Sequence, residues 1–316
     1  MNGAPRLDGT AVVVLNYRTP HKTIRAVHSV QNSRSPAAAI IVVDNASDDG
    51  SSALLQASLP GIRLITNTHN DGFSAGCNIG IRQALESGVG RVLLLNSDVI
   101  VPADMLGQLE KALDGDHLLG IVGPLVLSST NPECVESAGI AYSRRTGRMR
   151  HRDFGRARSA VQEFTTHIVD GVSGCAMLIR RDVIERIGLL AEEYFFGFED
   201  LDYCLRARQA GLLTACAGRT FVLHEGSVSI GRTSRLRVYY ATRNHLLLSN
   251  RFGASSRVAR WIRAANVMAL NAAFAATVTE LPRREALAGF ASGVRDYFAG
   301  RFHRAASLPA TEAHRH

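Results

Sequence analysis

Short apolar runs and segments of helical periodicity alternate through the first third of the chain, and this alternation constrains the fold more than any other feature of the sequence. The apolar runs consist mainly of Val, Ile and Leu, and their length is typical of strands that are buried on both faces. They occupy residues 11–15, 40–43, 62–65 and 92–95. Helical spacing marks residues 23–30, 51–57 and 78–86, the last followed by Gly88 as a C-terminal cap. This alternation predicts an α/β fold, in which helices flank both faces of a mostly parallel sheet.

The length and composition fit one such domain with a helical extension. The chain has 316 residues, of which 46% are hydrophobic and 20% charged, so a sizeable packed core is expected. We expect an α/β domain over residues 1–233, with a polar, arginine-rich insertion at 128–166. Residues 234–316 are expected to form a helical extension with a disordered tail. Within it, Val267, Leu270, Phe274 and Val278 form one stripe of an amphipathic helix, and Pro282 breaks the pattern.

Cysteine usage and the apolar segments indicate a cytoplasmic protein. The five cysteines are widely spread and include no close pair, which favours a reducing compartment. The first residues lack the basic and apolar regions of a signal peptide. The longest apolar segment, at 264–278, is short and carries Asn266 and Asn271, so it is expected to touch a membrane without crossing it.

The positive charge is concentrated near the end of the chain. The formal net charge is +8, and lysine occurs only at Lys22 and Lys111. No acid interrupts the arginines at positions 235, 237, 243, 251, 257, 260 and 263. This span is expected to bind anions, such as anionic lipid head groups on the inner face of the cytoplasmic membrane or a polyprenyl diphosphate. A solvated helical bundle or a homodimer interface is the alternative interpretation.

Polar residues follow three of the expected strands, at the sheet edge where α/β proteins bind ligands. Asn16 and Tyr17 follow the first strand, residues 44–50 follow the second, and residues 96–98 follow the fourth. Asp44, directly after a buried strand, is placed to accept hydrogen bonds from a nucleobase or ribose. Asp48 has two interpretations, a ligand or a cap of the following helix.

Asp98 is a candidate metal ligand. A carboxylate at one strand end, opposite a histidine from another, can hold a divalent cation whose other ligands are phosphate oxygens and water. The apolar strand at 220–223 ends at His224, which could supply that histidine. Taken singly, Asp98 could equally be a solvated turn residue, since Asn-Ser-Asp is common in turns. His224 taken singly could equally be a packed or capping histidine.

An acidic cluster lies on the first turn of an expected helix that ends near Gly211. Glu199, Asp200 and Asp202 follow the aromatic residues of 195–198. They could compensate the helix dipole, or apolar surroundings could keep one of them basic enough to accept a proton. The glycines at 72, 76 and 80 lack the spacing of a dinucleotide-binding loop, so they indicate close packing against a neighbouring strand or a bound diphosphate.

Taken together and in order, these segments resemble the family 2 glycosyltransferases of the GT-A fold, and within them the bacterial rhamnosyltransferase-like branch. The resemblance covers about residues 10–250. It rests on VVVLNYRTP, IIVVDNASDDGS, NDGFSAGCNIGI, LLLNSDVIVP, VSGCAMLIRRDVIERIG, FFGFEDLDYCLRARQAG and VLHEGSVSIG.

The resemblance implies an inverting transfer from a nucleoside-diphosphate sugar, assisted by Mg²⁺ or Mn²⁺. It implies Asp98 and His224 as metal ligands and Asp200, next to Glu199, as the general base. The expected donor is dTDP-rhamnose or a UDP-hexose, and the expected acceptor a lipid-linked or cell-envelope glycan. The donor-binding residues expected from the resemblance and the sheet edge are Asn16, Tyr17, Asp44, Asn45, Asp48, Gly72, Gly76, Asn96 and Asp98.

Three positions depart from the family pattern. The metal motif is Asn-Ser-Asp, without the first acid of Asp-x-Asp. Gly171 stands where the family often has tryptophan, and Leu190-Ala191 where it often has Phe-Asp. Two alternatives are an inactive binding module for anionic lipid or a protein partner, and a sugar nucleotidyltransferase. The latter lacks support because no glycine-rich loop follows the first strand. No pattern of a nucleic-acid platform is present.

Overall fold

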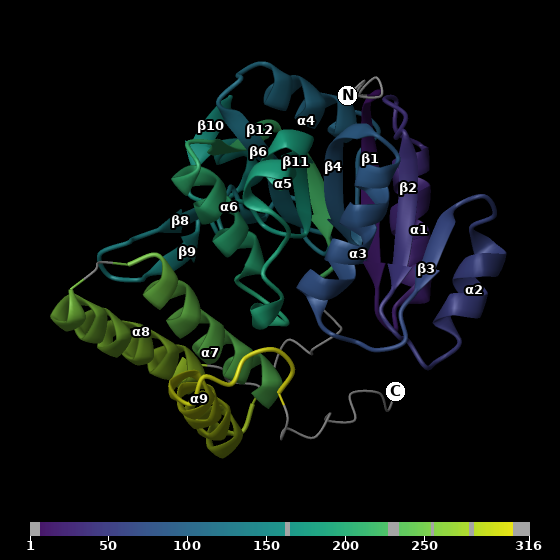
Figure 1. Cartoon of the computed structure of the whole chain (residues 1–316). Coiled ribbons are helices and arrows are strands. Elements are labelled where there is room, and N and C mark those ends of the chain that lie inside the picture. Colours follow the sequence, from purple (N-terminus) through teal and green to yellow (C-terminus); the bar gives the residue numbers. More distant parts are fainter. Residues whose placement is uncertain (1–6, 162–164, 227–233, 254–255, 278–280, 306–316) are drawn as a thin grey trace, which may run out of the picture.

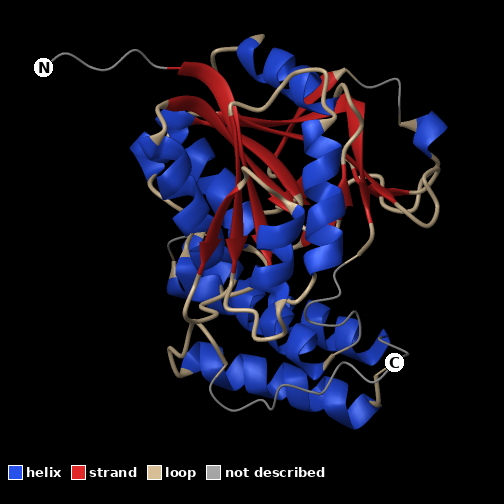
Figure 2. Ribbon diagram, turned by 90° about the vertical axis from the view of Figure 1, so that its right-hand side faces the viewer, coloured by secondary structure: helices blue, strands red, loops and turns tan. Residues whose placement is uncertain are grey.

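The computed structural model describes residues 7–161, 165–226, 234–253, 256–277 and 281–305. Its centre is a mixed ten-stranded sheet with helices on both sides (Figures 1 and 2). β5 (Val99–Ile100) and β7 (Val135–Ser137) pair with β12 and β6 at the side of this sheet. The remaining strands follow the order β10 (Thr166–Val169), β12 (Leu213–His224), β6 (Leu119–Ser128), β11 (Ala176–Arg180), β4 (Val89–Asn96), β1 (Leu7–Asn16), β2 (Ala39–Asp44) and β3 (Arg63–Thr66).

The expected strands and their directions are confirmed in the first part of the chain. β1 pairs in parallel with both β2 and β4, and β2 pairs in parallel with β3. β11 is antiparallel to both β4 and β6, so β6 runs in the same direction as β4. β12 is parallel to β6 and shares this direction. β5, β7, β10 and β11 run the opposite way, so the sheet is mostly parallel but mixed.

Two apolar cores lie on opposite faces of the sheet, because successive side chains of a strand point to opposite faces. Val12 and Val14 of β1 belong to one core, with α1 (Pro20–Gln31), α2 (Ser51–Ser58) and α4 (Met105–Asp114). Ala11 and Val13 belong to the other, with α3 (Phe73–Glu86), α5 (Arg181–Ile187) and α6 (Glu199–Gln209). Gly88 follows α3 with φ 76°, as expected of a C-terminal cap.

The polar insertion contains β-structure. β7 extends the main sheet beside β6, while β8 (Ile140–Tyr142) and β9 (Met149–His151) form a separate antiparallel hairpin. A short 3-10 helix, η1 (Arg158–Ala160), follows. The amide N–H of Ile140 donates to the Gly171 carbonyl at 2.7 Å, which ties the hairpin to the body of the domain.

The C-terminal extension consists of α7 (Arg235–Arg251), α8 (Arg257–Thr277) and α9 (Arg283–Phe298), which lie beneath the sheet (Figure 2). The expected stripe of α8 is wrong in part. Val267 is buried, but Phe274 is 42% exposed, and Val278 lies outside the described residues. The buried line is Arg263, Val267, Asn271 and Ala275 instead. No helix in the described part of the chain combines the length and apolar character needed to cross a bilayer.

Candidate active site

Hydrogen bonds join the loops after β1 and β2 at the carboxyl edge of the sheet. Asn16 lies opposite Asp44 in the strand register, and its Nδ2 donates to Asp44 Oδ1 at 2.7 Å. The other carboxylate oxygen of Asp44 accepts from the Ser52 hydroxyl, and both Asn16 and Asp44 are fully buried. The Arg18 guanidinium pairs with Asp48 and holds the pKa of that exposed carboxyl below its usual value. These contacts hold the two loops in one arrangement beside the half-buried Tyr17.

Asn45 and the glycines of α3 set the position of the next helix. Asn45 Nδ2 donates to the carbonyl of Gly72 at 3.0 Å. A Cβ at Gly72 would come within 2.4 Å of the Phe195 carbonyl oxygen, and one at Gly76 within 2.5 Å of a Leu15 methyl. Close approach to neighbouring chain segments therefore requires glycine at both positions.

A short antiparallel strand pair brings Asp98 and His224 together. After β4 the chain turns and continues as β5, which pairs with the end of β12 so that Val99 lies opposite His224. The Glu225 amide N–H also donates to the Asp98 carbonyl at 2.9 Å. The Asp98 Oδ2 atom consequently lies 3.5 Å from His224 Nε2. The residues directly after Asp98, Val99 to Val101, are apolar because β5 pairs with β12.

Glu136 of β7 sets the tautomer of His224. Its Oε2 atom lies 2.7 Å from His224 Nδ1, and a carboxylate can only accept, so Nδ1 carries the hydrogen. In the neutral ring the Nε2 lone pair then faces Asp98 Oδ2, an arrangement of two acceptors that needs a cation or a proton between them. Carboxylate suits Mg²⁺ and Mn²⁺, and imidazole suits first-row transition metals, so the pair fits a divalent cation. In the described ranges no group of three or more His, Cys, Asp or Glu side chains could hold a metal ion alone.

Asp200 and Glu199 begin α6 close to the end of β4. Asp200 is half-buried, and its two oxygens accept from the amide N–H groups of Gly174 at 2.9 Å and Leu201 at 2.7 Å. The neighbouring Cys175 carbonyl accepts from the Asn96 amide N–H at 2.9 Å, which connects the Asp200 segment to the turn that carries Asp98.

The two carboxyl groups differ in burial and in proton affinity. Glu199 is 6% exposed, and its Oε2 atom has no hydrogen-bond partner among the described residues. Burial, with the Asp200 charge as a second cause, raises the pKa of Glu199 to about 8. Burial also raises the pKa of Asp200, against the opposing effect of its backbone hydrogen bonds and of His151. At neutral pH Glu199 therefore holds a proton.

The loop that precedes Asp200 has a strained backbone and is held by α7. Phe195 and Phe198 have φ of 61° and 75°, which costs non-glycine residues about 1 kcal/mol or more each. Asn244 Nδ2 lies 2.8 Å from the carbonyls of Tyr194 and Phe196 and 3.0 Å from that of Gly197. The fully buried Arg243 donates to the Tyr194 and Glu193 carbonyls. The C-terminal extension thus fixes the loop that carries Asp200.

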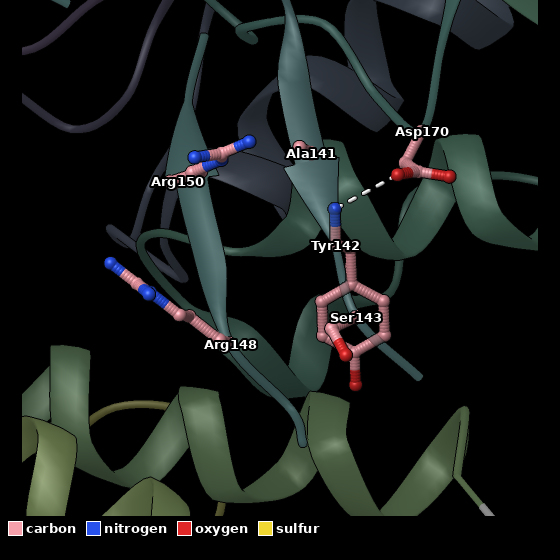
Figure 3. A pocket seen from close by; sticks show the side chains of 6 residues that line it. All are labelled: Ala141, Tyr142, Ser143, Arg148, Arg150 and Asp170. Atoms are coloured by element: carbon pink, nitrogen blue, oxygen red, sulfur yellow. Dashed lines mark hydrogen bonds between the residues drawn. The ribbon is translucent and has the colours of Figure 1, made fainter. Parts of the chain in front are cut away.

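A pocket of about 280 Å³ opens on the β8–β9 hairpin (Figure 3). Asp170 accepts from the Tyr142 amide N–H at 2.9 Å and pairs with Arg208 of α6. Arg148 and Arg150 project from β9 and the turn before it, and both are exposed. The lining residues are Ala141, Tyr142, Ser143, Arg148, Arg150 and Asp170.

The structure therefore places Asp44, Asp98, Asp200 and His224 around the carboxyl ends of β1, β2, β4 and β12. Sequence reasoning missed Glu136, His151, Arg243 and Asn244. Glu136 and His151 lie in the weakly periodic insertion, where no local signal marks them. The arginine-rich span did include Arg243, but its charge indicated an external anion rather than buried carbonyl groups.

Comparison with known proteins identifies the family. The family described as "Glycosyltransferase like family 2" matches residues 5–246. The chain is 28% identical to the low-salt glycan biosynthesis hexosyltransferase Agl10 of Haloferax volcanii, over 77% of this chain and 76% of that protein. It is 24% identical to the dTDP-rhamnosyl transferase RfbF of Shigella flexneri, over 75% and 78%. It is 26% identical to an N-acetylglucosaminyl-diphospho-decaprenol L-rhamnosyltransferase of Mycobacterium tuberculosis, over 71% and 78%.

Two solved structures share the fold. The mannosyltransferase PcManGT of Pyrobaculum calidifontis, in complex with GDP-Man and Mn²⁺, superposes with a TM-score of 0.56 and 18% identity, covering 95% of this chain and 76% of that one. GalNAc-T7 with UDP, GalNAc and Mn²⁺ gives a TM-score of 0.58 and 15% identity over 83% of this chain, which spans 55% of that protein. The chain thus has the GT-A fold and is a glycosyltransferase that belongs to glycosyltransferase family 2.

Proposed function

We propose that the protein is an inverting transferase that moves a sugar from a nucleoside-diphosphate sugar to a hydroxyl group of a lipid-linked glycan acceptor. The observation that carries this proposal is the meeting of the Asp98–His224 pair and the Asp200 carboxylate at one edge of the sheet. An inverting displacement needs charge neutralisation at the leaving group and a base at the nucleophile on the opposite face of the sugar.

In this mechanism Asp98 and His224 would hold a divalent cation. When bound, the cation supplies positive charge that stabilises the departing diphosphate. Glu136 keeps the hydrogen of His224 on Nδ1, so that Nε2 remains a ligand. The loops after β1 and β2, built around Asn16 and Asp44, form the expected surface for the base and ribose.

Asp200 accepts the proton of the acceptor hydroxyl as that oxygen attacks the anomeric carbon. Burial raises the pKa of Asp200, which makes it a stronger base than an exposed aspartate. The proton held by Glu199 removes the charge of that side chain, so Glu199 does not repel the neighbouring Asp200 carboxylate.

The Arg148 and Arg150 pocket supports an anionic acceptor. Neither guanidinium forms an ion pair within the described ranges, and both are exposed on the hairpin whose last residue is His151. Arginine binds phosphate oxygens through parallel hydrogen bonds, so a diphosphate-linked lipid suits this surface. The name of the mycobacterial relative, which states a diphospho-decaprenol substrate, supports the same acceptor class. The name of the Shigella relative supports dTDP-rhamnose as the donor, with a UDP-hexose as the second candidate.

The test combines donor binding with product analysis. The purified chain is incubated with Mn²⁺ and each of a panel of sugar nucleotides, and the melting temperature is recorded. Donors that raise it are then supplied with a polyprenyl-diphosphate sugar. We expect release of the nucleoside diphosphate and an inverted anomeric linkage. Release of pyrophosphate would indicate a nucleotidyltransferase, and binding without turnover would indicate an inactive binding module.

Glu136→Ala is expected to weaken Mn²⁺ binding about 10- to 100-fold, because a carboxylate that accepts a hydrogen bond from a ligating histidine orients its ring. The measurement is free Mn²⁺ by electron paramagnetic resonance, in the presence of the nucleoside diphosphate. Glu133→Ala, an exposed acid in the same insertion, is the matched control and should bind Mn²⁺ as the unmodified chain does. Equal Mn²⁺ affinity in both variants would remove Glu136 from the metal site.

A further inference from the structure

The solvent-facing side of α8 is apolar over most of its length. From position 261 to 276 every exposed residue of this helix is apolar: Trp261, Ile262, Ala265, Ala269, Ala273, Phe274 and Ala276. Val258 extends this face by one turn and is 69% exposed. Phe298 of α9 stacks on Trp261 with ring centroids 5.8 Å apart. We name this surface, residues 258–276 together with Phe298, the α8 face.

The buried line of α8 contains two polar residues, Arg263 and Asn271, beside the apolar Val267 and Ala275. Arg263 is buried and donates to Ser249 Oγ at 3.0 Å and to the Arg144 carbonyl at 3.1 Å. Asn271 is buried and lies 2.9 Å from His245 Nδ1. Two polar side chains of α8 are thus used inside the protein, while its largest apolar side chains, Trp261, Ile262 and Phe274, remain outside. An exposed apolar surface of this kind marks a contact site for a protein or a membrane.

Positive charge borders the α8 face. Arg257 and Arg260 are exposed at its first turn, and Arg283 and Arg284 are exposed at the start of α9. Neither α7 nor α8 contains an acidic residue. A helix with apolar residues on one side and arginines at its border is the arrangement that lies in the interface of an anionic membrane.

We propose that the α8 face binds an anionic lipid bilayer. Charge favours this occupant over a second copy of the chain. In a second copy packed on this face, α7 and α8 would offer no acid to neutralise Arg257 and Arg260. Anionic head groups neutralise the same arginines, while the short alanine side chains let the helix lie flat at the depth of the acyl boundary.

The α8 face is structurally joined to the pocket side of the molecule. Asn266 Nδ2 donates to the Thr146 carbonyl at 2.6 Å, so the turn of the β8–β9 hairpin rests on α8 (Figure 1). The same hairpin carries Arg148 and Arg150. The orientation of this pocket toward a lipid-linked acceptor rests on the proposed function, whereas binding of the bilayer by α8 does not.

The experiment uses the full chain and the emission of Trp261, the single tryptophan. Vesicles rich in phosphatidylglycerol are expected to co-sediment the protein, shift the Trp261 emission to shorter wavelength and let brominated lipids quench it. Pure phosphatidylcholine vesicles should bind about tenfold more weakly, and salt should weaken the binding to anionic vesicles.

Ile262→Glu is expected to reduce binding to anionic vesicles about tenfold or more, because a negative charge then replaces an apolar side chain that would enter the bilayer. Leu118→Glu is the matched control, since Leu118 is also an exposed apolar residue, 45% exposed, just before β6. Unchanged Trp261 emission with anionic vesicles overturns the proposal. A concentration-dependent dimer that Ile262→Glu dissociates assigns the face to a second copy and also overturns it.

Failure of the membrane proposal can be distinguished from failure of the proposed function. Sugar transfer to a water-soluble acceptor analogue without vesicle binding overturns only the membrane proposal. Vesicle binding without sugar transfer overturns only the proposed function.

Discussion

Asp200→Asn is expected to lower kcat by about two to four orders of magnitude, the usual contribution of a general base. Asparagine has nearly the same shape and keeps an acceptor oxygen for the Leu201 amide N–H, although the bond from the Gly174 amide N–H is lost. It cannot accept the proton of the acceptor hydroxyl at neutral pH. Donor affinity, measured by calorimetry with Mn²⁺ present, should change little because Asp200 faces the acceptor.

Asp182→Asn is the matched control for this change, since Asp182 lies on the first turn of α5 and pairs with Arg180 away from the sheet edge. Its kcat should equal that of the unmodified chain. A kcat of Asp200→Asn within about tenfold of that of the control would exclude Asp200 as the base. In the unmodified chain kcat/KM should fall as the pH drops through the pKa of Asp200, which burial raises above the ordinary value of 3.8.

Glu199→Gln is expected to stabilise the fold progressively as the pH rises from about 5 to about 9. The folded-state pKa of Glu199, about 8, exceeds the ordinary value of 4.5. A group with a raised folded pKa contributes stability that is fully present below its unfolded pKa and is lost as the pH rises through its folded pKa. Each unit of difference corresponds to about 1.4 kcal/mol, so the free energy of unfolding should differ by several kcal/mol at the alkaline end.

Denaturant unfolding of both proteins across this pH range measures the effect. Glutamine is a neutral group of the same length, so it removes the titration and keeps the packing. Glu133→Gln, an exposed site, should show the pH dependence of the unmodified chain. If the stabilities of Glu199→Gln and the unmodified chain run parallel at every pH, Glu199 has no raised pKa and Asp200 has no protonated neighbour.

The local sequence pattern was sufficient to predict the strands of the first half of the sheet. The runs that became β1, β2 and β4 are apolar on both faces, and the intervening helices carry their own periodicity, so each of these elements is specified by neighbouring residues. The run at 62–65 did form β3, but as an edge strand with exposed Arg63 and Thr66 rather than a buried one. The rule that parallel strands end at one edge then placed Asp44 and Asp98 on the same side. The positions of Asp200 and His224 depend on pairings between distant segments. For these two residues the prediction of a shared site therefore rested on the resemblance to a family.

Contacts between residues far apart in the sequence decided the other features of the site. Glu136 and His224 are 88 residues apart, and only the pairing of β7 with β6 and of β6 with β12 brings them within hydrogen-bond distance. Asn244 reaches the loop before Asp200 over a separation of 47 to 50 residues. Neither pair has a local sequence signal, since an isolated acid or amide looks the same whether it is solvated or bound.

The amino-acid pattern by itself determined the α/β body and the edge where its polar side chains gather, because burial of an apolar strand or helix face depends mainly on that segment's own residues. It also identified α8 as amphipathic. Which side of α8 faces inward was decided only by the folded chain, where Ser249, His245 and the hairpin carbonyl groups offer hydrogen bonds to Arg263 and Asn271. Those bonds hold Arg263 and Asn271 inside the protein, beside the buried Val267 and Ala275, and leave Trp261, Ile262 and Phe274 outside.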